Sequence, residues 1–568
     1  MMQTTVYDPL ERYKNEYCDL FLKNAQEAFD ELFKQAKIDK EKNQSLCLEI
    51  FNQSNERDSL ATSRSHWGIF RIICGILAVG SALIWPITEQ TTPGIIGLVA
   101  AGALLFYILA FLNKTIHQLD GKIQSLEADI QKKKEEALQI MQPLNDLFGW
   151  DIPAKLIQKT VPNLEFDPFF TQTRLAELEN EFGYDGSLNE NSSILFAQSG
   201  EINGNPFVVA DSKTFKMGCK TYTGRRTISW YASSIGPNGK RQMVRRSQVL
   251  TASITKPYPE YSNVGFVLYG NDAAPHLEFT RNRSQLTDDG FLQNFRRKKK
   301  LKELKKFSQN LKDESQYTLM NNHEFETLFE TKDRTDEVEY RLLFTALAQK
   351  QMLSLIKDKT LSYGDDFIFF KQKKINAIFP SHLTGSTLDT NPTQFADYDF
   401  NRCKRNFVRL NQEYFRSVYF AMAPLLAIPL YQQMRTRKNI YADSQKKSSS
   451  WEWESLANYL GEAQFQHAQC VTDNILKTTL KKEMPSGKSA IDVTAFGFRG
   501  EPRTERVQVF GGDGRYHSVP VQWIEYLPVS KTTTMIIEEK EEMNQGLVCK
   551  YLPESANTIC RRGIFARI

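Results

Sequence analysis

Two adjacent carboxylates, Asp365 and Asp366, are the residues most suggestive of chemistry, because they follow Tyr363-Gly364 between apolar segments. Paired carboxylates in such a turn can hold two Mg²⁺ ions for in-line phosphoryl transfer. That chemistry also needs a distant third carboxylate on a neighbouring strand and a large cleft for a template. The sequence offers no convincing partner strand, so we expect a Gly-Asp turn that leads into the strand FIFF.

Two glycine-containing strings have the composition of nucleotide sites. Pro485-Ser486-Gly487-Lys488-Ser489 ends like a phosphate-binding loop, but the pattern G-x-x-x-x-G-K-S requires glycine where Lys482 stands. Gly511-Gly512-Asp513-Gly514 joins two predicted strands and precedes no helix. We therefore expect an ordinary loop at the first string and a hairpin turn at the second.

Histidine and cysteine residues form no recognisable catalytic or metal-binding pattern. His467 and Cys470 lie three residues apart on one face of a predicted helix, but a structural zinc ion needs four ligands and no second pair has suitable spacing. Cys549 and Cys560 are isolated, and the eight cysteines include no C-x-x-C, so no disulfide framework is predicted. We assign no catalytic, metal or cofactor residue, although a site assembled from distant residues stays open.

A strongly basic run lies between residues 296 and 306. It contains one acid, Glu303, and eight cations: Arg296, Arg297, Lys298, Lys299, Lys300, Lys302, Lys305 and Lys306. A solvated helix face is the simplest interpretation of such a run. The functional interpretation is contact with anionic lipid or another polyanion, since each Lys or Arg near a lipid surface contributes about 1 kcal/mol. Nucleic acid is an unlikely partner, because aromatic residues do not interleave the run.

These residues belong to a chain of 568 residues, which is long enough for about three to five folded units. Apolar residues make up 41%, charged residues 24% and aromatic residues 12%, which is typical of globular proteins. The net charge of +5 is too small to indicate nucleic acid by itself. A mean hydropathy of −0.45 excludes a polytopic transporter but permits one or two membrane helices.

Two apolar runs predict a transmembrane helical hairpin at residues 67–112. The spans 67–87 and 93–112 each reach the roughly 20 residues needed to cross a bilayer, and Arg71 is the only charge in either. Lysines and arginines flank both outer ends, whereas the connection carries only Glu89. The positive-inside rule therefore predicts an inner-membrane protein with two spans and with both termini in the cytoplasm.

Helical stripes on both sides of the hairpin predict a coiled-coil stalk. Residues 113–150 carry an a/d seam of apolar residues from Ile116 to Leu144, interrupted once at Lys133. The N-terminal region, 1–66, carries an amphipathic stripe over residues 17–36. We favour pairing of these two stripes within the chain. The alternative is homo-oligomerisation through the seam or through small-residue faces, namely Ala78 with Ala82 and Gly97 with Ala101.

The other residues predict an α+β body of cytoplasmic antiparallel β modules with intervening helices. In chain order these are a connector at 151–191, a β module at 192–285, the basic helix at 286–319, an α+β block at 320–383, a helical region at 384–482 with a linker at 443–450, and a C-terminal β-rich module at 483–568. The apolar segment 417–431 is too short for a third span, so we expect it in a core. Ser449 and Glu452 fit a capping box.

One block resembles a known group of proteins. Glu324, Phe325 and Phe329 form an E-F-x-x-x-F segment, and Glu337, Glu339, Arg341 and Thr345 form an acidic-x-E-x-R-x-x-x-T stretch that precedes a helix and two strands. This block is similar to that of uncharacterised bacterial membrane proteins with an N-terminal transmembrane hairpin and a cytoplasmic domain of unknown function. The likeness covers roughly residues 60–383. It implies an architecture and a membrane location, but no activity or ligand. Ala346 replaces the proline that often follows the threonine in those proteins.

These patterns together favour a membrane-anchored protein that faces the cytoplasm and binds or organises a protein partner or anionic lipid. The alternative is a membrane-associated hydrolase or nucleotide-processing enzyme whose site is assembled from distant residues. A cleft that gathers carboxylates or histidines would favour the enzyme.

Overall fold

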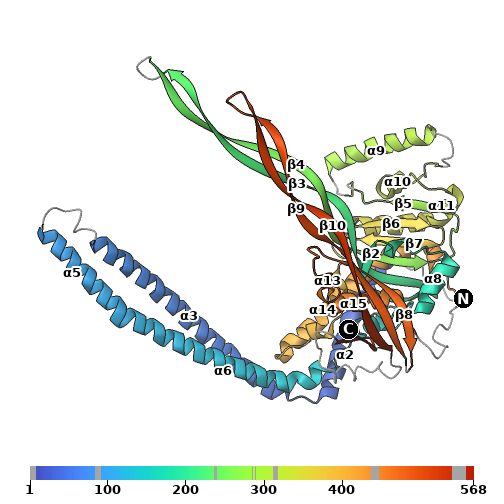
Figure 1. Cartoon of the computed structure of the whole chain (residues 1–568). Coiled ribbons are helices and arrows are strands. Elements are labelled where there is room, and N and C mark those ends of the chain that lie inside the picture. The colour runs from blue at the N-terminus through green and yellow to red at the C-terminus, as the bar shows by residue number, and fades with distance from the viewer. Residues whose placement is uncertain are drawn as a thin grey trace. The chain divides into compact units, whose positions relative to one another are not determined.

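The computed structural model describes residues 8–82, 91–235, 240–284, 286–287, 290–310, 317–436, 447–485, 487–539 and 558–568. The fold is α+β, with N-terminal helices followed by antiparallel sheets (Figure 1). The chain forms two compact units. The first comprises Met1–Ala25, Gly149–Asn391 and Asn411–Ile568, and the second comprises Gln26–Phe148 and Pro392–Leu410.

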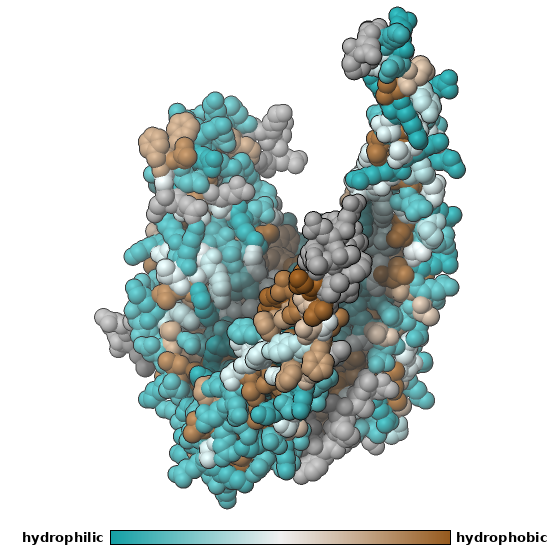
Figure 2. Space-filling view, turned by 90° about the vertical axis from the view of Figure 1, so that its left-hand side faces the viewer, coloured by the Kyte–Doolittle hydropathy of each residue, from teal (hydrophilic) through white to brown (hydrophobic). Residues whose placement is uncertain are grey.

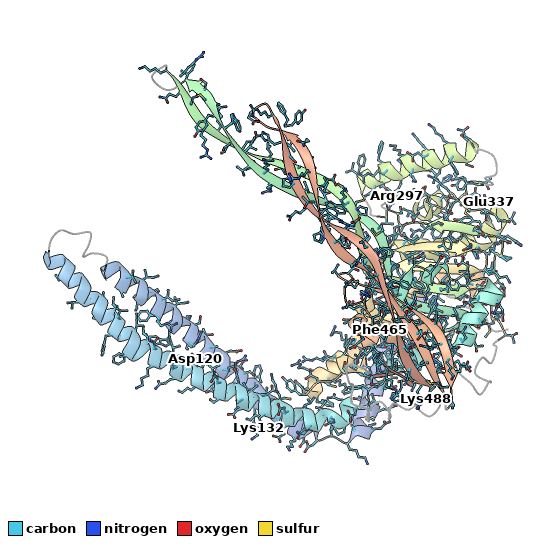
Figure 3. The ribbon with its side chains drawn as sticks, in the orientation of Figure 1. Asp120, Lys132, Arg297, Glu337, Phe465 and Lys488 are labelled. Carbon is cyan, nitrogen blue, oxygen red and sulfur yellow. The ribbon has the colours of Figure 1, made fainter. Side chains whose placement is uncertain are left out.

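The second unit is built on two long helical segments that lie side by side. One is α3 (Lys40–Ala82), and the other is formed by α5 (Thr91–Tyr107), the π-helical turn η2 (Ile108–Leu112) and α6 (Asn113–Asn145). Three ion pairs join α3 to α6: Lys42 with Glu136, Glu49 with Lys133, and Arg64 with Asp120. Asp120 is labelled on α6 in Figure 3. Because residue numbers rise along α3 as they fall along α6, the two helices are antiparallel.

The interruption of the predicted seam has a direct structural explanation. The Nζ of Lys133 lies 2.6 Å from the Oε2 of Glu49, so the cation reaches an acid on α3 while Ile130 and Ala137 pack with Ile50. The seam therefore pairs within the chain, but with a different helix from the one expected. The stripe at 17–36, on α2 (Cys18–Ala36), has other partners. Phe21 stacks on Phe415 within the first unit, with ring centroids 4.3 Å apart. Phe29 and Phe33 contact the ring of Phe400 within the second unit.

One helix among the described residues, Val99–Asn145, is long and apolar enough to cross a membrane by length and composition. Exposed apolar side chains also crowd the end of α3, where Ile72 is 60% exposed and Ile76 is 66% exposed. The connection 83–90, which contains Trp85 and Glu89, lies outside the described residues.

The first unit contains a seven-stranded antiparallel sheet of order β1-β2-β3-β4-β7-β6-β5. Its strands are β1 (Leu164–Phe166), β2 (Ser192–Ile202), β3 (Asn205–Ile235), β4 (Arg241–Gly270), β5 (Glu278–Arg281), β6 (Phe367–Gln372) and β7 (Ile375–Pro380). Asn203 and Gly204 join β2 to β3 with φ of 51° and 80°, as the expected Asn-Gly hairpin requires. The regions 192–285 and 320–383 share this one sheet, because β7 pairs with β4.

A second antiparallel sheet has five strands in the order β11-β12-β10-β9-β8. The strands are β8 (Ile475–Met484), β9 (Lys488–Phe510), β10 (Tyr516–Glu539), β11 (Thr558–Arg561) and β12 (Ile564–Arg567). β8 thus begins inside the region expected to be helical, 384–482. Gly487 and Gly514 have φ of 69° and 79° in the turns that follow β8 and β9, so both glycine-containing strings are hairpin turns. Ser486 lies outside the described residues.

Helices cover and join the two sheets. They are α1 (Pro9–Arg12) with the π-helical turn η1 (Tyr13–Tyr17), α7 (Ile152–Thr160), α8 (Gln172–Phe182), α9 (Phe291–Gln309), α10 (His323–Phe329), α11 (Glu337–Leu343), α12 (Ala346–Lys357), α13 (Gly385–Leu388), α14 (Phe400–Leu426) and α15 (Ser450–Leu460). α15 serves both hydrophobic cores, because Trp451 packs with Phe170 and Phe266 while Leu456 packs with Ile491. The segment 417–431, around the end of α14, is largely buried, as expected.

The strands of two hairpins extend well beyond the other strands of their sheets. β3–β4 and β9–β10 extend as twisted two-stranded ribbons (Figure 1). Where the ribbons meet, Ile228 and Leu250 of one pack with Val519 and Val521 of the other. Gly224 allows this approach, because a Cβ there would lie 2.1 Å from the backbone oxygen of Pro520. The predicted turn at 236–239 lies outside the described residues.

Candidate functional site

The basic run lies on α9, which is shorter at both ends than the expected basic-helix region 286–319. Two of its eight cations fix the helix to the body. The Nε of Arg297 donates to the backbone oxygen of Leu286 at 2.7 Å, and Lys300 pairs with Glu330 at 2.9 Å (Figure 3). The other six are exposed: Arg296, Lys298, Lys299, Lys302, Lys305 and Lys306. α9 therefore presents a dense cationic surface to solvent.

The inner face of α9 is held by packing and by one acid. Leu304 is fully buried, and the ring of Phe307 contacts that of Tyr317 edge-on, with centroids 5.3 Å apart. Glu330 lies between Lys300 and Lys332. Burial opposes the charge of Glu330, but its hydrogen bonds to these two ammonium groups hold the pKa of the carboxyl below its ordinary value. The acid stays ionised and anchors the helix.

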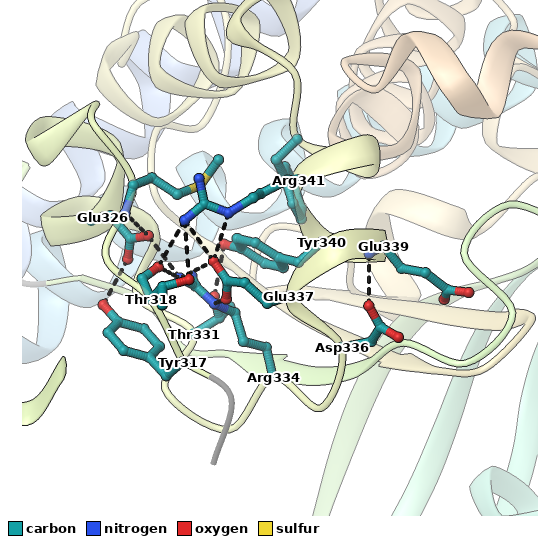
Figure 4. A network of polar contacts seen from close by, with 12 residues as sticks. Tyr317, Thr318, Glu326, Thr331, Arg334, Asp336, Glu337, Glu339, Tyr340 and Arg341 are labelled. Carbon is teal, nitrogen blue, oxygen red and sulfur yellow. Dashed lines mark hydrogen bonds and ion pairs between the residues drawn. The ribbon is translucent and has the colours of Figure 1, made fainter. Parts of the chain in front are cut away.

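A buried ion-pair network lies beneath this contact (Figure 4). The guanidinium of Arg334, which is 0% exposed, pairs with Glu326 at 3.0 Å and with Glu337 at 2.8 Å. Tyr317 donates its hydroxyl proton to Glu326 at 2.9 Å, and the rings of Tyr317 and Tyr340 lie 4.2 and 4.1 Å from the guanidinium carbon. Each buried charge thus has a close partner, which is what makes its burial tolerable.

The residues of the resemblance motif serve this scaffold. Phe325 and Phe329 stack at 4.8 Å within an aromatic core that includes Phe344. Glu337 bridges Arg334 and Arg341. Thr345 accepts a hydrogen bond from the backbone N–H of Ala348 and caps α12, so the helix begins at Ala346 without a proline. These contacts hold the elements of the block together.

The two carboxylates of the Gly-Asp turn are separated by their partners. Asp365 forms a buried ion pair with Arg281, and Asp366 contacts the Nδ1 of His382 at 2.5 Å. The His382 ring stacks on Tyr363 at 3.7 Å. Burial raises the pKa of Asp365, while the Arg281 guanidinium opposes this rise. The turn leads directly into β6, as expected from the sequence.

The expected helix around His467 and Cys470 is wrong. α15 ends at Leu460, where Gly461 adopts φ of 103°, and both residues follow in a turn segment. The Sγ of Cys470 faces Thr472 and Asn474 rather than the His467 side chain. Over the described part of the chain, no cluster of three or more His, Cys, Asp or Glu residues has the geometry to hold a metal ion.

A cavity of about 610 Å³ lies between the roots of the two ribbons, and sequence reasoning missed it. Four aromatic residues line it, namely Phe215, Tyr261, Phe496 and Phe498, together with aliphatic and polar residues. Lys477 also lines it, but this ammonium is paired with Glu454 at 2.9 Å. Because the lining comes from five strands and one loop, no local pattern in the sequence could have revealed it.

Comparisons with known proteins give no indication of the function of this chain. No family model, no curated protein and no solved structure matches this chain.

Proposed function

We propose that this protein is a membrane-anchored scaffold whose body contacts anionic lipid through α9. In this proposal, residues 67–87 and 93–112 form two inner-membrane spans, α3 and α6 form a stalk, and the rest of the chain faces the cytoplasm. The protein would then be one of the uncharacterised bacterial membrane proteins that residues 60–383 resemble.

The observation that carries the proposal is the composition of the exposed surface of α9. Beside its six exposed cations, the helix exposes three apolar side chains at its start: Phe291 is 89% exposed, Leu292 is 71% exposed and Phe295 is 66% exposed. Hydrophobic residues stand out among hydrophilic ones at this end of the body (Figure 2). Large apolar side chains next to lysines are the composition of a helix that lies on an anionic membrane, with its apolar residues in the interface and its cations at the phosphates.

Two further observations support the anchor. Apolar residues of α3 and α5 are exposed over much of both helices, including Ile76, Val79 and Phe106 at 66%, 63% and 68%. Such a surface is costly in water and favourable in lipid. In addition, Arg71 donates to the Oδ1 of Asn113 at 3.3 Å. This contact places the start of the first apolar run beside the end of the second.

A vesicle-binding experiment tests the role of α9. The full chain is held in nanodiscs of neutral phosphatidylcholine and mixed with phosphatidylcholine vesicles that contain or lack phosphatidylglycerol. The variant Lys298→Gln/Lys299→Gln/Lys302→Gln removes three exposed cations. At about 1 kcal/mol each, the loss is up to roughly 100-fold in affinity for the anionic vesicles.

A matched control removes three exposed lysines elsewhere: Lys373→Gln, Lys482→Gln and Lys531→Gln. Equal binding by both triple variants would refute the proposal, because net charge would then be the determinant. A second variant, Phe291→Ser/Phe295→Ser, should also weaken binding while keeping every charge.

The enzyme alternative finds its best candidate in Asp366 and His382. The Nε2 of His382 lies 3.0 Å from the backbone oxygen of Ser417, not from a hydroxyl or thiol that it could deprotonate. Among the described residues, the His382 ring thus hydrogen-bonds to no hydroxyl or thiol, which weakens the case for a hydrolase site at this pair.

A further inference from the structure

The distal part of the β3–β4 ribbon is strongly basic, unlike the other long ribbon that the structure describes, β9–β10. Residues 224–249 contain six cations and no acid: Arg225, Arg226, Lys240, Arg241, Arg245 and Arg246. The β9–β10 ribbon instead alternates its charges, as in the ion pairs of Arg503 with Glu501 and Glu525. The positive charge of the β3–β4 ribbon is therefore not neutralised within the ribbon.

This basic segment extends past the support of the second ribbon. The backbone N–H of Gly512, in the turn of β9–β10, donates to the Oε1 of Gln248 at 2.7 Å, and Gln248 pairs with Ile228. Strand pairing continues beyond that point to Ile235 and Arg241. The ring of Trp230 still lies beside Gly512, and at about 3.4 Å per residue the ribbon projects on the order of 15 Å past Trp230.

Cations stand on both faces of the projecting ribbon. Residues directly opposite in an antiparallel pair share a face, and successive residues alternate. Tyr231 lies opposite Arg245 and Ile235 lies opposite Arg241, so these four residues share one face. Trp230 lies opposite Arg246, on the other face. Figure 3 shows side chains standing out from both sides of this ribbon.

We propose that the distal β3–β4 ribbon binds duplex DNA by entering the major groove. That groove is about 12 Å wide and admits a two-stranded ribbon, and its walls carry phosphates on either side. Cations on both faces of the ribbon can then each reach a phosphate. Arginine supplies three of the four cations in the projecting part, and its planar guanidinium donates two hydrogen bonds at once to a phosphate, whereas Arg226 lies nearer the body and donates to the backbone oxygen of Ser518 in the second ribbon.

Two features favour DNA over a bilayer or duplex RNA. A flat membrane can contact only one face of the ribbon, and the sequence of the end, GPNGKRQ, is too polar to insert into lipid. The major groove of duplex RNA is too narrow for protein elements to enter. Unlike α9, this ribbon places an exposed aromatic residue beside a cation, because Tyr231 is 66% exposed and lies opposite Arg245. This inference does not depend on lipid binding by α9.

The test measures DNA binding by the full chain in neutral nanodiscs. Fluorescence anisotropy follows a labelled DNA duplex as the salt concentration rises, for the wild type and for Arg241→Gln/Arg245→Gln/Arg246→Gln. Loss of three phosphate contacts should reduce the log–log salt slope by about 2.7 and the affinity on the order of 100-fold. The matched control is the α9 triple variant, Lys298→Gln/Lys299→Gln/Lys302→Gln, which should bind DNA like the wild type.

Further arms make each outcome decisive. The three replaced arginines are exposed, so the variant should keep the wild-type circular dichroism spectrum, and Arg→Lys at the same positions should retain most of the affinity. Unchanged DNA binding by the Gln variant overturns the proposal. Equal affinity for duplex RNA or single-stranded DNA overturns groove entry. A ribbon-dependent affinity for phosphatidylglycerol vesicles, without one for DNA, makes the ribbon a second lipid contact instead.

Discussion

A single buried carboxylate provides the sharpest test of the energetics of the body. Asp211 lies on β3 and is 0% exposed, and neither of its carboxylate oxygens has a well-formed hydrogen bond among the described residues. The chain closes over it at Gly385, where a Cβ would lie 2.8 Å from the Oδ2 of Asp211. Burial raises the pKa of Asp211 to about 6, and the backbone of Ser212 opposes only part of this rise.

The size and sign of the effect follow from this shift. A carboxyl with a pKa of 3.8 when unfolded and about 6 when folded binds its proton more tightly in the folded state. Its favourable contribution is complete below pH 3.8 and is lost as the pH rises through 6. Above that pH, the ionised carboxylate reduces the free energy of unfolding by about 3 kcal/mol, since each pKa unit corresponds to about 1.4 kcal/mol.

The substitution Asp211→Asn removes the charge and nearly preserves the shape. It should raise the free energy of unfolding by about 2 to 3 kcal/mol at pH 7.5 and should have little effect near pH 4. Urea denaturation of the full chain in neutral nanodiscs, followed by tryptophan fluorescence at both pH values, measures the difference. Asp473→Asn, at an exposed site, is the control. Equal stabilisation at both pH values, or none at pH 7.5, would refute an ionised, unpaired Asp211.

Two further pairs of substitutions test the buried ion-pair network and the contact between the two ribbons. Arg334→Met leaves Glu326 buried without its cation and should lower the free energy of unfolding by about 3 to 5 kcal/mol. Arg341→Met, at a guanidinium that is 45% exposed, should lower it by less than about 1 kcal/mol. Similar losses for both variants in urea denaturation would contradict a larger contribution from the buried ion pair. Gly224→Ala should separate the ribbons, because its Cβ would meet the backbone of Pro520, whereas Gly218→Ala meets only the movable side chain of Glu260. Faster amide hydrogen exchange at Val519 and Val521 in Gly224→Ala alone is expected, and unchanged exchange would contradict the close approach.

Local patterns in the sequence predicted local features well. The Asn203-Gly204 turn, the turn before β6 and the hairpin at Gly511 to Gly514 all depend on residues that are adjacent in the chain. The prediction of a helix that continues through Cys470 is wrong, because α15 ends before Gly461. The seam at 113–150 was recognisable, but its partner was not, since several amphipathic stripes in one chain can satisfy the same pattern.

The basic run shows how far a candidate site can be read from sequence. The pattern identified the eight cations of α9. It could not show that Lys300 forms an ion pair with Glu330 or that Arg297 donates to the backbone oxygen of Leu286. The six cations of the β3–β4 ribbon form no such run, because they are separated along the chain. Strand pairing brings Arg241 and Arg245 beside Ile235 and Tyr231.

The apolar runs, the turns and the charged segments are recognisable from the sequence, because they depend on residue type and short-range spacing. The fold adds that two predicted modules share one sheet, that α3 pairs with α6, and that Asp365 and Asp366 have separate partners. These features depend on burial and pairing, which are set by residues distant in the chain. The same cation is a solvated charge, a structural anchor or a binding group according to what the fold places next to it.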